Sequence, residues 1–269
     1  MKNEKQIVPK LRFPEYKGSK EWNIEPFSDI YSFYGTNSFS WENLNFRDGN
    51  VKNIHYGDIH KKFNTLFDIN NEIVPYINPD ISVDKIKPES YCIEGDMVFA
   101  DASEDLNDVG KSIELVNLGS ERIVAGLHTL LARQRAKRLQ TGFGGYLFKS
   151  SSIRSQIKRE AQGAKVLGIS APRLAKVKVY YPVDKDEQIH IVECLSSLDE
   201  LISVNNQKLE ALKNHKKGLL QQLYPAEGEK VPTLRFKEFE KESKWMNLCL
   251  KDISFPITEK AGTNVLTTA

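Results

Sequence analysis

The sequence DEQIHIVECLSSLDELISVNNQKLEALKNHKKGLLQQL, residues 186–223, decides how this chain is organised. It contains no proline and a single glycine, Gly218, so it predicts one continuous helix that ends before Pro225. At about 1.5 Å per residue such a helix spans roughly 57 Å, which is longer than a small domain is wide. Part of the helix must therefore extend beyond any single core.

One face of this helix carries an apolar seam. Its positions alternate steps of four and three residues, the spacing of a coiled coil. Asn205 and Lys216 interrupt the seam, as polar residues do where they fix register and partner choice. We predict that the helix pairs with another helix, although packing along its own domain is an alternative. The expected pairing residues are Ile191, Leu195, Leu198, Ile202, Asn205, Leu209, Leu212 and Leu219.

A repeat begins just after the helix. The segment VPKLRFPEYKGSKEW at 8–22 recurs as VPTLRFKEFEKESKW at 231–245, with a constant offset of 223 and no gap. Solenoid units span about 20 to 50 residues, so this longer period indicates a duplicated domain. The second copy has little room to fold, and we expect the tail at 257–269 to be disordered or an altered reading-frame end. The predicted parts are a globular domain at 1–184, the helix at 185–225 and a truncated second copy at 226–269.

The globular part mixes strand patterns with few helical ones. Residues 151–162 start with serines and place Ile153 and Ile157 on one stripe, which predicts a short helix. The fold class is therefore α+β, with one globular domain of mixed strands and short helices followed by a long, protruding, coiled-coil-like helix. The expected strands are 53–56, 97–100, 112–116, 129–134 and 177–182.

Charge is unevenly distributed along a chain whose net charge is only +2. Residues 63–110 hold eleven acidic residues against two lysines, whereas residues 128–182 hold twelve basic residues against Glu160 alone. Clustered Lys and Arg bind nucleic acid by displacing counterions, although a solvated helix face gives the same pattern. The candidate phosphate contacts are Lys137, Arg138, Arg154, Lys158, Arg159 and Lys165.

Two turn-rich stretches, 34–50 and 55–64, could project into a DNA groove. The first combines aromatic residues with Asn amides, which suit bidentate contact with adenine. The second places His and Lys after a glycine turn, where they could reach phosphates or guanine edges. Ordinary polar surface loops are the alternative for both. The candidate DNA contacts here are Asn43, Arg47, Tyr56, His60, Lys61 and Lys62.

No catalytic residue, metal site or cofactor is predicted. GFGGY at 142–146 follows a basic, polar stretch instead of the strand that a cofactor loop requires, so a stand-alone DNA methyltransferase is a weaker alternative. The acidic residues at 96–108 would suit a metal-dependent nuclease but equally fit a solvated loop. Neither the five histidines nor the three cysteines have the spacing of a zinc site.

No apolar run approaches the 18 residues of a membrane span, and the N-terminus lacks a signal-peptide pattern. We therefore expect a cytoplasmic protein.

These features together resemble the specificity subunits of type I restriction-modification systems. The resemblance rests on IHYGDIHKKF at 54–63, EGDMVFADASEDLNDVGKSIELV at 94–116, VAGLHTLLAR at 124–133, the entry into the long helix at 182–188, and the restart VPTLRF at 231–236. In that family two target-recognition domains alternate with two long helices that pair antiparallel, and each domain reads half of a bipartite DNA site.

The resemblance implies a non-catalytic chain that binds double-stranded DNA, methylase subunits and restriction subunits. Methylase subunits that bind S-adenosylmethionine and motor-nuclease subunits would supply the chemistry. Since this chain carries one recognition domain, two copies could pair as a homodimer and read a palindromic, interrupted site. An inactive truncated subunit that only sequesters methylase subunits is the alternative.

Overall fold

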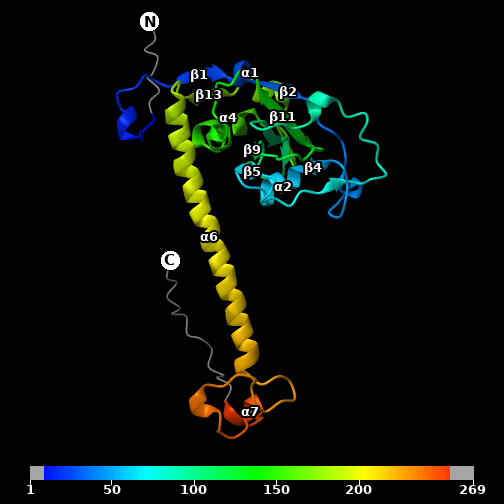
Figure 1. Cartoon of the computed structure of the whole chain (residues 1–269), viewed down its shortest axis with the longest axis vertical. Coiled ribbons are helices and arrows are strands. Elements are labelled where there is room, and N and C mark those ends of the chain that lie inside the picture. Colours follow the sequence, from blue (N-terminus) through cyan, green and yellow to red (C-terminus); the bar gives the residue numbers. More distant parts are fainter. Residues whose placement is uncertain (1–8, 255–269) are drawn as a thin grey trace. The chain divides into compact units, whose positions relative to one another are not determined.

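The structure, a computed structural model, describes residues 9–254 (Figure 1). It divides into two compact units, Met1–Leu198 and Asp199–Ala269, and each is described by itself. The boundary falls inside the long helix, so the first turns of that helix belong with the globular unit. The expectation for the tail at 257–269 lies outside the described residues.

A five-stranded sheet forms the centre of the first unit. Its strand order is β2-β11-β7-β9-β5, antiparallel except for the parallel pair β9 and β5. All four residues of β7 are buried, as expected for a central strand covered on both faces. The strands are β2 (Tyr31–Tyr34), β11 (Thr129–Gln134), β7 (Met97–Ala100), β9 (Ser112–Asn117) and β5 (Leu66–Asp68).

Three smaller sheets surround the central one. A four-stranded sheet has the order β10-β4-β6-β3, and two further pairs are β1 with β13 and β12 with β8. Their bounds are β10 (Ile123–Ala125), β4 (Lys52–Ile54), β6 (Tyr76–Ile77), β3 (Leu44–Asn45), β1 (Asn23–Pro26), β13 (Lys178–Tyr181), β12 (Leu167–Gly168) and β8 (Ala102–Ser103).

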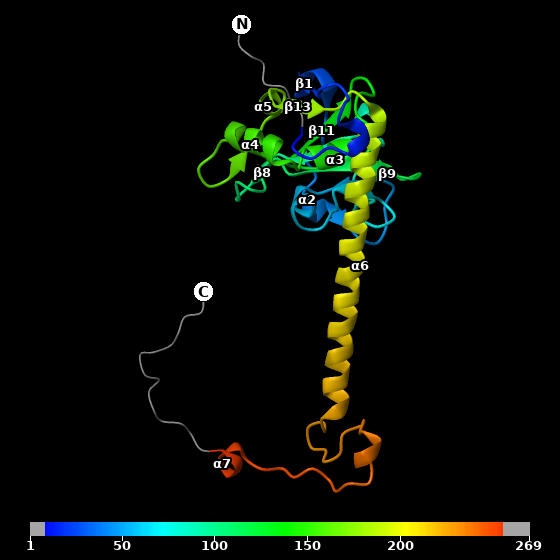
Figure 2. The same ribbon diagram turned by 90° about the vertical axis from the view of Figure 1, so that its left-hand side faces the viewer.

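The helices of the first unit are short, apart from the start of α6. Figure 2 shows α4, α5 and β8 grouped on one side of this unit, away from the first turns of α6. The α-helices are α1 (Phe27–Ile30), α2 (Tyr56–Lys61), α3 (Phe143–Leu147), α4 (Ser151–Glu160), α5 (Ala171–Leu174), α6 (Lys185–Leu223) and α7 (Leu250–Ile253). The 3-10 helices are η1 (Pro14–Tyr16), η2 (Trp41–Asn43), η3 (Pro88–Ser90) and η4 (Lys237–Phe239).

An aromatic cluster dominates the core beside the central sheet. Phe27 stacks on Tyr31 with ring centroids 4.8 Å apart, and Phe148 packs edge-on against Phe99 at 5.1 Å. All four rings are almost completely buried. Each buried ring contributes roughly 2–3 kcal/mol, so this cluster anchors α1, through Phe27, to the central sheet.

The α+β class is confirmed, and β7 and β11 have the bounds predicted from sequence. The long helix is confirmed as α6, and the helix predicted at 151–162 ends two residues earlier. The stretch 55–64 is not a loop, because residues Tyr56–Lys61 form α2. His55 caps this helix by accepting a hydrogen bond from Gly57 N at 3.1 Å, and Lys62 pairs with Asp58 one turn back at 2.7 Å.

Two buried polar residues fix the start of α6 to the first unit. Glu187 accepts hydrogen bonds from Arg12 Nε at 2.7 Å and Nη2 at 2.6 Å. The Gln188 side chain accepts from Gln140 N at 2.7 Å and donates to Pro182 O at 2.8 Å. Hydrogen bonds are directional, so these buried contacts fix both the position and the orientation of the first turn of α6 relative to the first unit.

The rest of α6 presents apolar side chains to solvent. Leu198, Ile202, Leu209 and Leu212 are each at least half exposed. Leu201, Val204 and Leu220 are exposed as well, so the apolar face is wider than the predicted seam. Among residues 9–254, no helix is long and apolar enough to cross a membrane.

Candidate nucleic-acid interface

The structure brings together the two stretches that sequence singled out separately. Trp41, in η2, lies over His55 with ring centroids 4.3 Å apart. Lys62, just after α2, places its Nζ 5.7 Å from the Trp41 ring centre and 6.0 Å from that of Phe46. Trp41 and Phe46 are 43% and 54% exposed, so both side chains are partly open to solvent. We call this surface, with exposed Arg47 and Lys61, the aromatic-basic patch.

A cluster of imidazole and phenol rings continues from the patch along α2. The Tyr56 ring lies 6.1 Å from His60 and 5.4 Å from His128. Burial lowers the pKa of His55, and its Nδ1 accepts a hydrogen bond from Gly57 N. His60 Nε2 lies 3.1 Å from Ala102 O, whereas its buried Nδ1 has no hydrogen-bond partner in residues 9–254.

His128 occupies a strained position beside this cluster. Its φ of 57° lies in the left-handed region, which a residue with a β-carbon enters at a cost of about 1 kcal/mol or more. Its Nδ1 lies 3.3 Å from Asp101 Oδ1. Burial raises the pKa of Asp101, and the contact with His128 opposes that shift. The His128 side chain is about half exposed and lines a groove.

The groove has a volume of about 920 Å³. It runs between residues 33–39, the loop 82–90 and the turn 124–129. A second hollow of about 350 Å³ shares Asp101 and His128 with it and continues to Arg173. Asn37, Lys85 and Lys87 line the groove, so it offers both cations and an amide.

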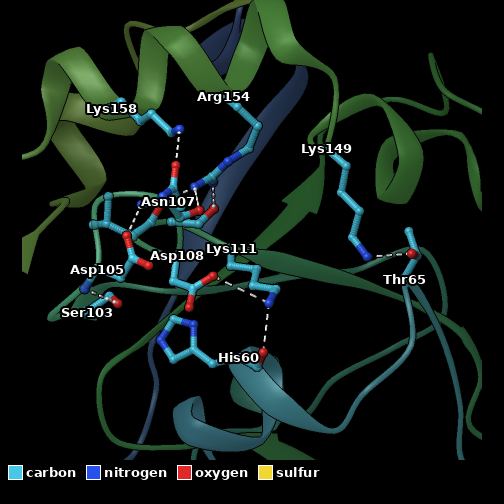
Figure 3. A network of polar contacts seen from close by, with 12 residues as sticks. His60, Thr65, Ser103, Asp105, Asn107, Asp108, Lys111, Lys149, Arg154 and Lys158 are labelled. Carbon is cyan, nitrogen blue, oxygen red and sulfur yellow. Dashed lines mark hydrogen bonds and ion pairs between the residues drawn. The ribbon is translucent and has the colours of Figure 1, made fainter. Parts of the chain in front are cut away.

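An internal network links α2, the acidic loop and α4 (Figure 3). Arg154 donates to three backbone oxygens, of Asn107 at 2.8 Å, Val109 at 2.7 Å and Gly110 at 2.9 Å. Lys158 donates to Asn107 Oδ1 at 2.6 Å, and Lys111 donates to His60 O at 2.7 Å. The loop at 103–111 therefore connects α4 to α2 through these hydrogen bonds.

A glycine run and a buried carboxylate connect α3 to the sheet. Glu114 Oε2 accepts a hydrogen bond from Gly145 N at 2.7 Å, and burial raises the pKa of Glu114 to about 7 against the opposing backbone hydrogen bonds. A β-carbon at Gly144 would come within 2.8 Å of Tyr31 Oη, and one at Gly145 within 2.9 Å of Leu66 Cδ2. The glycines of GFGGY thus allow close packing on β9.

The acidic residues considered for a nuclease have other partners. Asp96 is completely buried and takes two hydrogen bonds from Arg133, each at 2.8 Å. Asp105 Oδ1 accepts from Asn107 N at 2.7 Å, and Asp108 pairs with Lys111 at 3.5 Å. No group of three potential metal ligands is found in the part of the chain that the structure describes.

Comparison with known families identifies the fold. The family model described as "Type I restriction modification DNA specificity domain" matches residues 41–214, well over half of the chain. This chain belongs to that family. The matched region begins at Trp41, in the aromatic-basic patch, and includes most of α6. The patch therefore lies within the part of the chain that matches the family. A specificity domain is a non-catalytic part of such a system, in agreement with the sequence prediction.

Two solved structures are similar to this specificity domain. The S subunit of a type I restriction-modification system from M. genitalium is 14% identical with a TM-score of 0.53, and the match covers 81% of this chain and 49% of that one. The HsdS subunit from Thermoanaerobacter tengcongensis is 13% identical with a TM-score of 0.45, covering 75% and 42%. The chain thus spans about half the length of the M. genitalium S subunit. A search of curated proteins found no match.

The predicted base-contacting residues of the specificity domain lie in three different environments. Arg47 and Lys61 are exposed, and neither side chain makes a hydrogen bond or ion pair with residues 9–254. Asn43 is half-buried and its Oδ1 accepts from Ser40 N at 3.0 Å, so it shapes the turn. Tyr56 and His60 belong to the ring cluster. Their roles in DNA binding stay predictions.

The predicted phosphate contacts also separate. Arg154 and Lys158 are held in the network of Figure 3, and Arg138 is ion-paired with Glu25. The Lys137, Arg159 and Lys165 side chains are exposed and have no hydrogen bond or ion pair with the described residues. Burial also lowers the pKa of Arg154. The basic run in the sequence therefore includes residues that stabilise the fold as well as residues available to a ligand.

Sequence reasoning missed the groove and the strained His128. The groove depends on three segments that are far apart in the chain, and no periodicity marks it. The only sequence signal for His128 was its place in GLHT, directly before β11. A histidine following a glycine turn and preceding a strand is too common to be singled out.

Proposed function

We propose that this specificity domain reads one half of a DNA site and directs a methylase and a restriction subunit to it. The observation that carries the proposal is the convergence of Trp41, Phe46 and α2 into one exposed aromatic-basic patch within the matched family region. Exposed rings beside lysines offer stacking, cation–π contacts and charge, which together suit nucleic acid.

Within this proposal the DNA contacts divide by type. Arg47 and Lys61 have free side chains at the patch and would reach base edges, with Asn43, Tyr56, His60 and Lys62 shaping the surface. Lys137, Arg159 and Lys165 would contact phosphates. Arg138, Arg154 and Lys158 would contribute mainly by holding the backbone that presents these groups, because the protein already occupies their hydrogen bonds.

We propose further that the working form is a dimer of half-length subunits paired through α6. The exposed leucines and isoleucines of α6 support this, since a helix with an apolar face is stabilised by burying it against a partner. The Asn205 amide donates to Leu201 O at 2.7 Å and would have to rotate to bond across a helix pair. A symmetric dimer would favour a palindromic, interrupted site. The globular domain at 1–184, the helix at 185–225 and the second copy at 226–269 would be its working parts.

Methylome sequencing tests the central proposal. Cells that carry a type I methylase subunit of the same system are compared with and without this chain. The expected result is methylation of one interrupted motif only when the chain is present. An unchanged pattern, with the chain co-purifying with the methylase, would support a subunit that merely sequesters methylases. Methylation by the purified chain alone would contradict its non-catalytic role.

A further inference from the structure

The two copies of the repeated segment have the same local fold. We call residues 9–30 the first clasp and residues 231–253 the second clasp. Each contains a 3-10 turn and a short helix at equivalent positions, η1 with η4 and α1 with α7, all 223 residues apart. Arg12 donates to the carbonyls of Ser19 and Lys20, and Arg235 donates to those of Glu242 and Ser243, again 223 residues on.

The first clasp holds the beginning of α6. Arg12 pairs with Glu187, which is 1% exposed, and Trp22 Nε1 also donates to Glu187 at 3.2 Å. Tyr16 Oη lies 2.8 Å from His190 Nδ1. Strand β1 then pairs with β13 in the register Pro26 opposite Lys178. This set of contacts is the seat of the first clasp.

The second clasp has apolar residues at the equivalent positions, but these residues are exposed. Phe27 and Ile30 are fully buried, whereas their counterparts Leu250 and Ile253 are 76% and 65% exposed. Tyr16 is 8% exposed and its counterpart Phe239 is 55% exposed. Arg235 has no carboxylate partner among residues 9–254. The second clasp therefore has an apolar surface that the described residues of its own chain leave exposed, and an arginine that they leave without a carboxylate partner. Such a segment can bind a matching surface elsewhere.

We propose that the second clasp of one copy takes the seat of the first clasp on a second copy of this chain, displacing that copy's residues 9–30. The inference deepens the proposed dimer and rests on that proposed function. The first clasp shows what the segment recognises, namely a buried carboxylate at the start of α6 and the edge of β13 with which β1 pairs. The second clasp keeps the arginine, the tryptophan and the apolar positions that make those contacts.

The exchange also defines how two copies meet. The second clasp is hydrogen-bonded to the last turn of α6 through Leu234 N and Gln222 O at 2.9 Å. The seat lies at the first turn of α6. A reciprocal exchange therefore pairs the end of each α6 with the start of the other, which places the two helices antiparallel. Because one clasp replaces another with similar contacts, the exchange costs little, as in domain swapping.

A disulfide between two differently tagged copies tests the exchange. In the seat, Cys249 replaces Pro26 and lies opposite Lys178, at a Cα separation of about 4.5–5.5 Å that a disulfide can bridge. Copy A carries Lys178→Cys, Cys194→Ser and Cys249→Ser, and copy B carries Cys194→Ser and retains Cys249. Since each copy has one exposed thiol, only a bond between copies can form when oxidised glutathione is added. The control replaces Lys178→Cys in copy A with Lys61→Cys.

The expected result is a disulfide-linked heterodimer in at least several-fold higher yield than for the Lys61→Cys control. Arg12→Ala in copy A weakens the competing first clasp and should raise the yield, whereas Arg235→Glu in copy B should abolish it. Circular dichroism checks that each variant is folded. Yields equal to the control overturn the inference, even if light scattering shows a dimer, and the helix pairing then stands without the exchange. DNA reading is judged separately by the methylome.

Discussion

Residues 9–30 and 231–253 share a sequence pattern and a local fold, yet they differ in almost everything that contributes to stability. The first segment buries its arginine against Glu187 and its apolar residues in the core of the first unit. The second forms the same turn and the same arginine hydrogen bonds with its apolar residues exposed.

The difference shows that this segment can form its turn whether or not its side chains are buried. Arg12 and Arg235 each bond to carbonyls seven and eight residues ahead, so those contacts need only the local chain. The ion pair with Glu187 joins residues 175 positions apart and needs a folded domain. Matched substitutions in the two segments can therefore separate local from tertiary contributions.

The largest effect is expected from truncating the matched isoleucines. Ile30→Ala should lower the free energy of unfolding by about 4 kcal/mol, because it leaves a cavity in a fully buried site. Ile253→Ala should change it by less than about 0.5 kcal/mol. Urea denaturation at low protein concentration, where copies are separate, measures both. Similar losses for the two variants would mean that the second segment is buried too.

Truncating the two matched arginines should give a slightly smaller difference in the free energy of unfolding than truncating the isoleucines. Arg12→Ala leaves Glu187 buried without its partner and should cost about 3 kcal/mol, the lower part of the range for a broken buried pair. Arg235→Ala removes only backbone contacts on an exposed turn and should cost about 1 kcal/mol or less. Arg12→Lys is a useful third variant, since it keeps the charge but loses the two-pronged contact. Equal costs for Arg12→Ala and Arg235→Ala would remove the distinction.

Buried and exposed carboxylates can be compared in the same way, by measuring the free energy of unfolding as a function of pH. Burial raises the pKa of Glu114 to about 7, so its stabilising effect is complete below the unfolded pKa near 4.5 and is lost as pH rises through 7. Glu114→Gln, which stays neutral, should therefore be more stable than the parent by about 2–3 kcal/mol at pH 8 and equal to it near pH 4. Exposed Glu238→Gln is the control. A pH-independent difference would contradict the cause assigned here.

The smallest effects are expected from substituting exposed lysines and arginines. These substitutions test whether an exposed cation contributes to DNA binding wherever it lies. Lys61→Ala at the patch should weaken binding to the recognised DNA by about 1–3 kcal/mol with less effect on random DNA. Arg159→Ala should weaken binding to the recognised and the random DNA similarly. It should also lower the salt dependence of binding by about one phosphate contact. Lys241→Ala, on the second segment, should affect neither. Fluorescence anisotropy over a salt series reports all three. Equal effects of Lys61→Ala on both duplexes would remove its assignment as a base reader.

Much of the fold followed from local pattern. The strands at 97–100 and 129–134 and the long helix were predictable because each is dominated by its own periodicity. The segment after His55 was wrongly expected to be a loop, since its helix depends on a histidine cap and a single ion pair that periodicity does not reveal. The two stretches chosen as DNA loops were near the candidate site, but nothing local indicated that Trp41 would stack on His55.

The basic run shows the same division at the level of single residues. Its net charge was visible, but residue type alone does not distinguish Arg154, which donates to three backbone oxygens, from Arg159, which is exposed. On α4 these two residues lie five positions apart and face different surroundings. Which one is available to a phosphate depends on where the acidic loop at 103–111 packs.

By itself the sequence determined the repeat, the long helix and the strands at 97–100 and 129–134, because these depend on internal similarity or on the period of apolar residues. Only the tertiary structure decided which clasp is buried, which cations are occupied and which loops share a surface. Those outcomes depend on long-range packing, in which a residue's neighbours come from distant parts of the chain and set its solvation.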